Sequence, residues 1–312
     1  KDNSPDCIVM VSGGRDSIYG LHYVREELKL NPIAYTYDWG MVTDLARRNI
    51  SRICGKLGIE HILVSADINE KRKNIRRNVN AWLKRPRLGT IPLFMAGDKQ
   101  FFSYARKMRE QTGCDLVFMC DTHLEKTGFK TGFTGVSEFN QKDGAWHPYE
   151  VSILRKLWMV GYYAKEFILN PSYINASIFD TLNAFYASYI QPHDFVSLYS
   201  YIQWDENEIM PVLQGQYDWE VANDTSQTWR IGDGTAAFYN YIYYTMAGFT
   251  ENDTFLSNMI RENMITRDQA LSLVKDRNQP RFESMKWYCD INGIDFELAI
   301  RTINSAPRLW NS

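Results

Sequence analysis

Residues 7–17 read Cys-Ile-Val-Met-Val-Ser-Gly-Gly-Arg-Asp-Ser. The apolar run is typical of a buried strand, and the pattern that follows predicts a helix, so the two glycines lie in a strand-to-helix turn. Gly13 and Gly14 allow a positive φ and a close approach between the backbone and a ligand. The N–H groups of such a turn and of the helix start bind anions. The stretch therefore predicts a phosphate-binding loop, with an ordinary capped turn as the alternative.

The polar side chains of this loop suit a pyrophosphate group. Ser12 and Ser17 supply hydroxyl donors, and Arg15 supplies a guanidinium fork for phosphate oxygens. The Asp16 carboxylate would repel phosphate unless a cation lies between them, so we expect Mg²⁺ there. The loop is neither a Walker loop nor the Gly-x-Gly-x-x-Gly of dinucleotide-binding folds. The residues expected to contact the nucleotide here are Val11, Ser12, Gly13, Gly14, Arg15, Asp16 and Ser17.

The string at 12–17 resembles the PP-loop of the N-type ATP pyrophosphatases, a superfamily that includes asparagine synthetases, NAD synthetases and tRNA thiolation enzymes. The resemblance implies that ATP, bound with Mg²⁺, is cut between its α- and β-phosphates and that the AMP half activates an oxygen. It also implies an α/β fold with a parallel sheet of the nucleotide α-hydrolase, Rossmann-like type and a helical C-terminal portion. We accordingly expect a PP-loop ATP pyrophosphatase domain at 1–165 and a helical substrate or interface domain at 166–312.

A longer similarity runs through 37–40, 228–230 and 255–262, and it resembles the N-acetyl sugar amidotransferases of surface-polysaccharide biosynthesis. It implies that nitrogen replaces the activated oxygen of a small acceptor, which converts an amide to an amidine. The acceptor would be an amino sugar or a nucleobase-like molecule. No cysteine-led glutaminase domain is visible in the sequence, so we expect a separate protein to supply the ammonia.

The N-terminal half alternates short apolar runs with helical patterns, and the second half is rich in aromatic residues. We expect strands at 6–11, 33–37, 59–64 and 115–119. We expect helices at 18–28, 43–57, 71–84, 99–112, 262–277 and 281–292. Strands that alternate with helices predict a parallel sheet with right-handed crossovers. Ligands of such sheets lie beyond the carboxyl ends of the strands.

Two strand ends therefore supply further candidate residues. Tyr37, Asp38 and Trp39 end the second strand, where we expect contacts with the ribose or adenine; a turn with a partly buried tryptophan is the alternative. The fourth strand leads into 120–125. Asp121, His123 and Glu125 alternate there and would share one side of an extended stretch. We expect Asp121 to be catalytic, and for His123 a base or positioning role stands against a solvated surface histidine.

Cys120 begins this second strand end. If the enzyme transfers sulfur rather than nitrogen, Cys120 is the expected carrier, loaded by a sulfur-donor protein and acting on a nucleobase-like carbonyl. Structural burial is the alternative. A required Cys120 would therefore indicate sulfur transfer, and a dispensable Cys120 would indicate nitrogen transfer.

Two cations from later segments are expected to complete the site. Lys130 lies in the glycine-spaced loop 127–135, which would close over the nucleotide. Arg230 lies in 228–234, Thr-Trp-Arg-Ile-Gly-Asp-Gly, and would neutralise the pyrophosphate as the α–β bond breaks. The alternative for Arg230 is an ion pair with Asp233 that holds a turn.

The composition limits the class of protein. The chain has 312 residues, is 45% hydrophobic and carries a net charge of −2, which argues against a nucleic-acid partner. The basic stretch 71–87 is either a solvated helix face or a patch for a phosphorylated substrate. Five cysteines without a Cys-x-x-Cys pair argue against a disulfide framework or a four-cysteine zinc site. No apolar run reaches the roughly 20 residues of a membrane span.

We therefore expect a cytoplasmic enzyme with no membrane partner, and the aromatic second half leaves room for a homo-oligomer. The favoured function is ATP-dependent nitrogen transfer, and the runner-up is sulfur transfer through Cys120. The non-enzymatic alternative is a nucleotide sensor that uses the loop without turnover.

Overall fold

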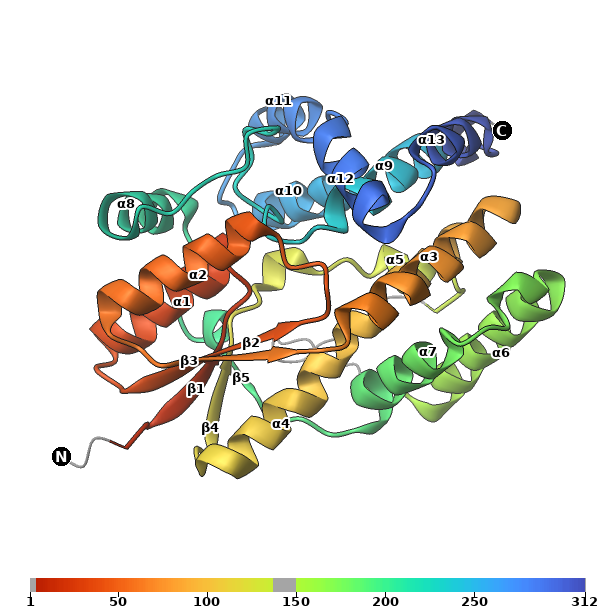
Figure 1. The fold of residues 1–312 in the computed structure, drawn as a ribbon. Coiled ribbons are helices and arrows are strands. Elements are labelled where there is room, and N and C mark those ends of the chain that lie inside the picture. Colours follow the sequence, from red (N-terminus) through yellow and green to blue (C-terminus); the bar gives the residue numbers. More distant parts are fainter. Residues whose placement is uncertain (1–3, 137–149, 312) are drawn as a thin grey trace.

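A five-stranded parallel sheet forms the centre of the protein. The computed structural model describes residues 4–136 and 150–311. The strand order is β3-β2-β1-β4-β5, and the strands are β1 (Cys7–Met10), β2 (Pro32–Asp38), β3 (His61–Ser65), β4 (Leu116–Met119) and β5 (Val196–Ser197). The α/β architecture with a parallel sheet and a helical C-terminal portion is thereby confirmed (Figure 1).

Helices cover both faces of this sheet. Those of the N-terminal half are α1 (Arg15–His22), α2 (Asp44–Leu57), α3 (Ile68–Lys84), α4 (Phe101–Thr112) and α5 (Phe129–Gly132). Those of the second half are α6 (Ile153–Leu169), α7 (Ile178–Phe185), α8 (Glu206–Tyr217), α9 (Ala236–Ala247), α10 (Glu251–Arg261), α11 (Arg267–Arg277), α12 (Phe282–Asn292) and α13 (Phe296–Ser305). Figure 1 shows α1 and α2 on one side of the strands and α4 on the other.

Two cores lie on the two faces of the sheet, because neighbouring residues of a strand point to opposite sides. Ile8 and Met10 of β1 belong to a core with residues of α3, α4, α9 and α12. Cys7 and Val9 belong to a second core with residues of α1, α2, α8 and α10. All four residues of β1 and all seven of β2 are buried, as expected for a sheet covered on both faces.

Segments of π-helix and 3-10 helix continue or connect these helices. Among the residues that the structure describes, two segments are π-helical, at Tyr23–Glu27 and Tyr186–Ile190. The 3-10 segments are Leu88–Gln100, His123–Glu125, Pro171–Tyr173, Leu198–Ser200 and Leu309–Asn311. In the described parts of the chain, none of the helices has the length and apolar character that a membrane span requires.

The predicted strands and N-terminal helices are present with shifted boundaries, and two elements differ. The predicted helix 262–277 is instead two helices, because α10 ends at Arg261 and Thr266 starts α11 with a capping box to Gln269. The strand β5 was not predicted, because two residues are too few to show an alternating pattern.

The predicted boundary after residue 165 lies inside α6. The strand β5 joins the sheet by pairing with β4, and α8 packs on α1 and α2. Residues from both predicted parts therefore share one sheet and both cores.

Candidate active site

The loop between β1 and α1 lies at the carboxyl end of the central strand. Gly13 has a φ of +80°, and a Cβ there would lie 2.5 Å from the carbonyl oxygen of Ala46 in α2. Only glycine fits this position without strain. Gly14 caps α1 without a side-chain hydrogen bond. The first N–H groups of a helix have no partner within it, so those of α1 remain available to a ligand.

Two serine hydroxyls hold the loop in shape. The Ser17 Oγ accepts a hydrogen bond from the Ser12 N–H at 3.0 Å and donates one to the Gly14 carbonyl at 3.1 Å. The Ser12 Oγ lies 3.1 Å from the Ser17 Oγ. Ser12 is exposed and Gly14 half-buried, so these two residues form the open side of the loop.

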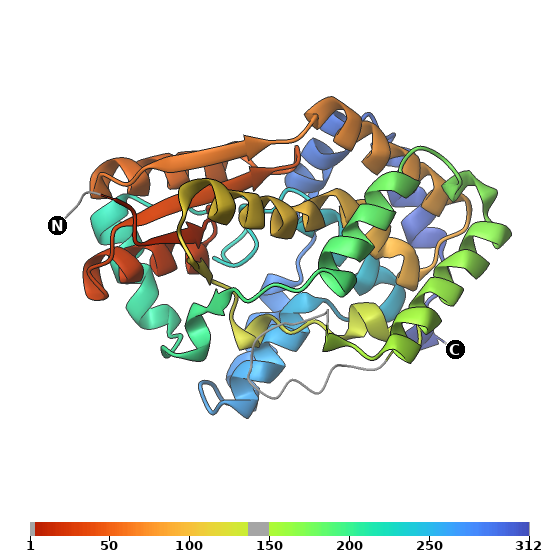
Figure 2. The same ribbon diagram turned by 90° about the horizontal axis from the view of Figure 1, so that it is seen from below.

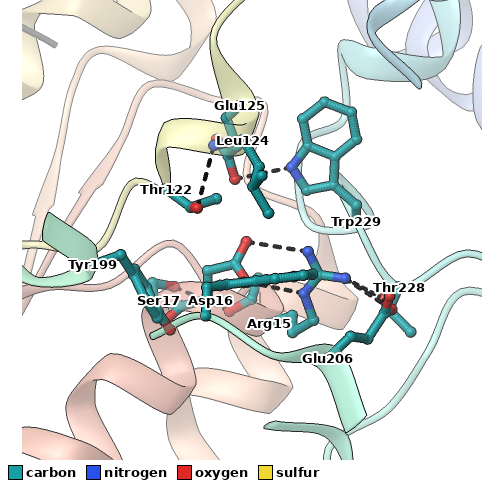
Figure 3. A network of polar contacts seen from close by, with 12 residues as sticks. Arg15, Asp16, Ser17, Thr122, Leu124, Glu125, Tyr199, Glu206, Thr228 and Trp229 are labelled. Carbon is teal, nitrogen blue, oxygen red and sulfur yellow. Dashed lines mark hydrogen bonds and ion pairs between the residues drawn. The ribbon is translucent and has the colours of Figure 1, made fainter. Parts of the chain in front are cut away.

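The structure places Arg15 on the other side, away from the position expected for phosphate binding. The residue is only 1% exposed and lies over the ring of Trp204. Its Nη1 donates to the Glu206 Oε1 at 2.8 Å and to the Thr228 Oγ1 at 2.6 Å (Figure 3). Its Nε donates to the Asp16 Oδ1 at 2.9 Å. Arg15 therefore ties the loop to the C-terminal half.

Asp16 and Glu125 bring two carboxyl groups together. The Asp16 Oδ1 also accepts from the Trp204 Nε1 at 2.7 Å, and the Glu125 Oε1 accepts from the Trp229 Nε1 at 2.9 Å. The Asp16 carboxylate lies close enough for its charge to act on Glu125. Burial, aided by the Asp16 charge and opposed by Arg230, raises the pKa of Glu125 to about 8. Glu125 therefore keeps its proton more readily than an ordinary glutamate.

Arg230 lies on the far side of Glu125, between two carboxylates. Its Nη2 is 3.7 Å from the Glu125 Oε2 and 3.6 Å from the Glu251 Oε1. The backbone of Arg230 has a φ of +57°, which is unusual for a residue other than glycine. Its Nε is buried and has no hydrogen-bond partner among the described residues. The expected ion pair with Asp233 is also present, at 3.9 Å.

Glu251 continues this chain of charges to Lys130. The carboxylate is fully buried, pairs with the Lys130 Nζ and accepts a hydrogen bond from the Tyr239 hydroxyl at 2.6 Å. Although burial would raise it, Lys130 and Arg230 hold the pKa of Glu251 at about 2. Lys130 therefore lies at the end of a buried network that reaches the loop through Arg230.

Opposite charges alternate along this network with one interruption. Its order is Lys130, Glu251, Arg230, Glu125, Asp16, Arg15, Glu206 and Arg277. The alternation breaks only where Glu125 faces Asp16. A cation at this point would restore it.

The end of β2 is more enclosed than expected. The Asp38 carboxylate accepts from the Gly40 N–H at 2.8 Å and pairs with Arg47. Trp39 is 5% exposed, and the Tyr37 hydroxyl donates to the Gln100 Oε1 at 3.1 Å. The structure thus has a turn with a buried tryptophan here, and the expected contacts with the ribose or adenine stay a prediction.

The residues after β4 separate into different environments, because His123–Glu125 is a helical turn and not an extended stretch. The Asp121 Oδ1 accepts from the Ser197 Oγ at 2.9 Å, next to β5, and the His123 Nε2 lies 3.8 Å from the Glu262 Oε1. Glu125 alone of the three alternating residues reaches Asp16.

Cys120 is packed against α1. A Cβ at Gly20 would lie 2.4 Å from the Cys120 Sγ, so the thiol fills the space that the glycine leaves. Burial, followed by the charges of Asp121 and Asp16, raises the pKa of the thiol. A thiol held neutral in the core is a poor nucleophile.

The segment 228–235 from the second half covers the loop. Asp233 forms a bridge with Val42, and the Gly234 N–H donates to the Met41 carbonyl at 3.0 Å. A Cβ at Gly232 would lie 3.3 Å from the Ser12 carbonyl oxygen and 3.6 Å from the Gly14 nitrogen. The segment that carries Arg230 therefore contacts the backbone of the loop at 12–17.

Sequence reasoning missed four residues of the network. Glu125 was visible only as one of three alternating polar residues. Glu206, Glu251 and Arg277 gave no signal, because a charged residue in an amphipathic region has no distinguishing neighbour.

No protein-family model matches the chain, and a search of curated proteins gives no significant match. Within 4–136 and 150–311, no group of three or more His, Cys, Asp or Glu side chains is arranged to hold a metal.

Proposed function

We propose that this protein is an AMP-forming ATP pyrophosphatase that adenylates a carbonyl or amide oxygen of a small acceptor and replaces it with nitrogen. The observation that carries the proposal is the loop at 12–17, a glycine turn with two serine hydroxyls at the carboxyl end of the central parallel strand. A loop of this shape at the start of a helix suits the β- and γ-phosphates of ATP.

Ser12, Gly14 and the first N–H groups of α1 would bind the phosphates. The residues present also fit Mg²⁺, because the carboxyl groups of Asp16 and Glu125 lie close enough to interact and both could bind one cation. Mg²⁺ commonly binds through one or two carboxylates and substrate phosphates. When bound, the ion would neutralise charge on the leaving pyrophosphate. A magnesium site of this kind needs only two carboxylates from the protein, because the phosphates of ATP and water supply the other ligands.

Arg230 would supply the second positive charge. Negative charge grows on the oxygen that leaves the α-phosphate, and a fixed buried donor stabilises it without reorganisation. The Arg230 Nε has no hydrogen-bond partner among the described residues, and Glu251 holds the guanidinium in place. Lys130 acts on this arrangement through Glu251, as a positioning residue.

Nitrogen transfer is preferred to sulfur transfer because of Cys120. A carrier cysteine must expose a thiolate to its donor and acceptor, whereas this thiol packs against Gly20 and its pKa is raised. Ammonia needs no covalent residue. The proposal includes ATP and Mg²⁺, a cytoplasmic setting, an amino-sugar or nucleobase-like acceptor, and a separate glutaminase as the ammonia source.

The test is the fate of ATP labelled in its α-phosphate, with Mg²⁺, ammonium and a panel of acetamido sugars and nucleobases. We expect labelled AMP together with pyrophosphate. Asp16→Asn and Glu125→Gln should reduce the rate at least 100-fold, since each removes a proposed ligand of the cation. Glu262→Gln, in the exposed pair with His123, is the matched control and should leave the rate unchanged. Labelled ADP would overturn the proposal, and ATP binding without turnover on any acceptor would favour a sensor.

A further inference from the structure

Helix α6 has an apolar face that no other described part of the chain covers. Its large apolar side chains are between 48% and 75% exposed. They are Ile153, Leu154, Leu157, Trp158, Val160, Ile168 and Leu169. At about 200 Å² for a large apolar residue, their exposed surface amounts to about 900 Å². The largest apolar patch of a typical monomer is roughly 300–600 Å². This face therefore has the properties of an interface.

The face follows a heptad pattern. Its central positions are spaced three and four residues apart in alternation, as in helices that pair with other helices. They are Leu154, Leu157, Gly161, Ala164 and Ile168. The opposite side of α6 is fixed to the molecule, since Met159 and Glu166 are buried and Glu166 pairs with Arg85. The heptad positions accordingly point away from the rest of the protein.

Gly161, in the middle of the face, has no function within one chain. A Cβ at this position would meet nothing within 4 Å. Glycine destabilises a helix interior relative to alanine, and neither packing nor a positive φ requires it here. Gly161 and Ala164 together leave a shallow centre between the larger residues at the two ends. A second helix backbone can approach closely at such a centre.

We propose that this face is a homodimer interface, in which two copies of α6 pair antiparallel about a twofold axis at Gly161. Leu154 lies seven residues before Gly161 and Ile168 seven after it, so the axis brings each opposite the other. A twofold interface requires this kind of self-complementary surface. The exposed area matches the roughly 800 Å² per partner of a stable interface.

Helix α7 extends the same end of the molecule. Figures 1 and 2 both place α6 and α7 at the end opposite the N-terminus. The exposed apolar residues of α7 and the turn after it are also spaced three or four apart, at Phe179, Leu182, Tyr186 and Ile190. A lipid surface would need neither the small central residues nor the symmetric spacing, so we assign the face to a second copy of the chain.

The interface also connects to the proposed site. The Trp158 Nε1 donates to the Thr134 carbonyl at 2.9 Å, just after the helix α5 that carries Lys130. Trp158 is itself 64% exposed, and dimerisation would enclose it. Formation of the dimer is nevertheless independent of the reaction, and its test does not need the substrate.

The first experiment measures the mass of the full chain in solution by sedimentation velocity. We expect a dimer for the wild type and a monomer for Gly161→Leu, whose side chain has room in one chain but not between two. Gly215→Leu is the matched control, because Gly215 is also exposed within a helix and a Cβ there meets nothing within 4 Å. A wild-type monomer, or a Gly161→Leu dimer, would overturn the proposal.

The second experiment tests the axis. Gly161→Cys should form an intermolecular disulfide under mild oxidation, because a residue at a twofold axis meets its own copy. Gly215→Cys should not, and the five native cysteines are all buried. Cross-linking of both variants to the same extent would contradict the assignment. Binding of a monomeric wild type to anionic phospholipid vesicles would replace it with a membrane surface.

Discussion

At the scale of single residues, the two glycines of the loop have different functions. Gly13 has a positive φ and no room for a Cβ beside Ala46, whereas Gly14 has a φ of −75° and only the Ser12 Oγ near it, at 3.5 Å. We expect Gly13→Ala to destabilise the fold by about 1–3 kcal/mol.

Gly14→Ala is the companion variant. It should leave the melting temperature nearly unchanged but weaken ATP binding about tenfold or more, because its methyl group would occupy the open side of the loop. Thermal unfolding and calorimetric titration with ATP distinguish the two effects. Equal loss of stability in both variants would show that the loop is shaped by something other than Gly13.

Glu125 gives the site a dependence on pH. Its pKa is about 8 in the folded protein, against about 4.3 in an unfolded chain. The folded state therefore holds a proton that the unfolded state has lost, so stability falls as the pH rises from about 5 to 8. In Glu125→Gln we expect this fall to be smaller by about 4 kcal/mol, at roughly 1.4 kcal/mol for each of the three pH units. Urea unfolding at the two pH values measures it, and parallel behaviour of the variant and the wild type would contradict the carboxyl pair.

The role of a residue could be predicted from the sequence where it depends on neighbouring residues, as in the turn at Gly13 and Gly14. It could not be predicted where the contacting residues are far away in the sequence. Arg15 is a natural phosphate ligand by sequence, yet Glu206 and Thr228, 191 and 213 residues away, bind its guanidinium. Glu251 was not predicted as the carboxylate between Arg230 and Lys130 for a similar reason, because Lys130 is far from it in sequence.

At the scale of elements, the packing of α1 on β4 depends on Gly20 and Cys120. Gly20→Ala would place a Cβ 2.4 Å from the Cys120 Sγ, and we expect a loss of about 1–3 kcal/mol. Cys120→Ala should cost less, should retain AMP formation with ammonium, and should partly rescue Gly20→Ala in the double variant. The free energies of unfolding of the three variants measure this coupling. If the Cys120→Ala variant folds stably but has lost turnover, sulfur transfer becomes the favoured reaction.

Elements with long periodic patterns were predicted well, since apolar runs and glycine or proline stops mark the first four strands. The short strand β5 was not predicted, because it forms only by pairing with β4. The separation of α10 from α11 was not predicted either, because the capping box at Thr266 lies inside a continuous polar pattern.

At the scale of the whole molecule, the C-terminal half holds the loop between β1 and α1 in place. Trp204, Glu206 and Thr228 supply the partners of the buried Arg15 guanidinium, and an unpaired buried charge is strongly destabilising. We expect a fragment of residues 1–165 to lack a cooperative unfolding transition by circular dichroism. A fragment that unfolds cooperatively and binds ATP would show that the N-terminal part is an independent domain.

The central claim is that an acceptor oxygen attacks the α-phosphate of ATP, and an oxygen label tests it most directly. Acetamido sugars with ¹⁸O in the amide group are incubated with the protein, ATP, Mg²⁺ and ammonium, and the AMP and pyrophosphate are weighed by mass spectrometry. The account predicts one ¹⁸O in AMP, none in pyrophosphate, and an amidine product without the label. Unlabelled AMP, or label in a β-phosphate product, would contradict it.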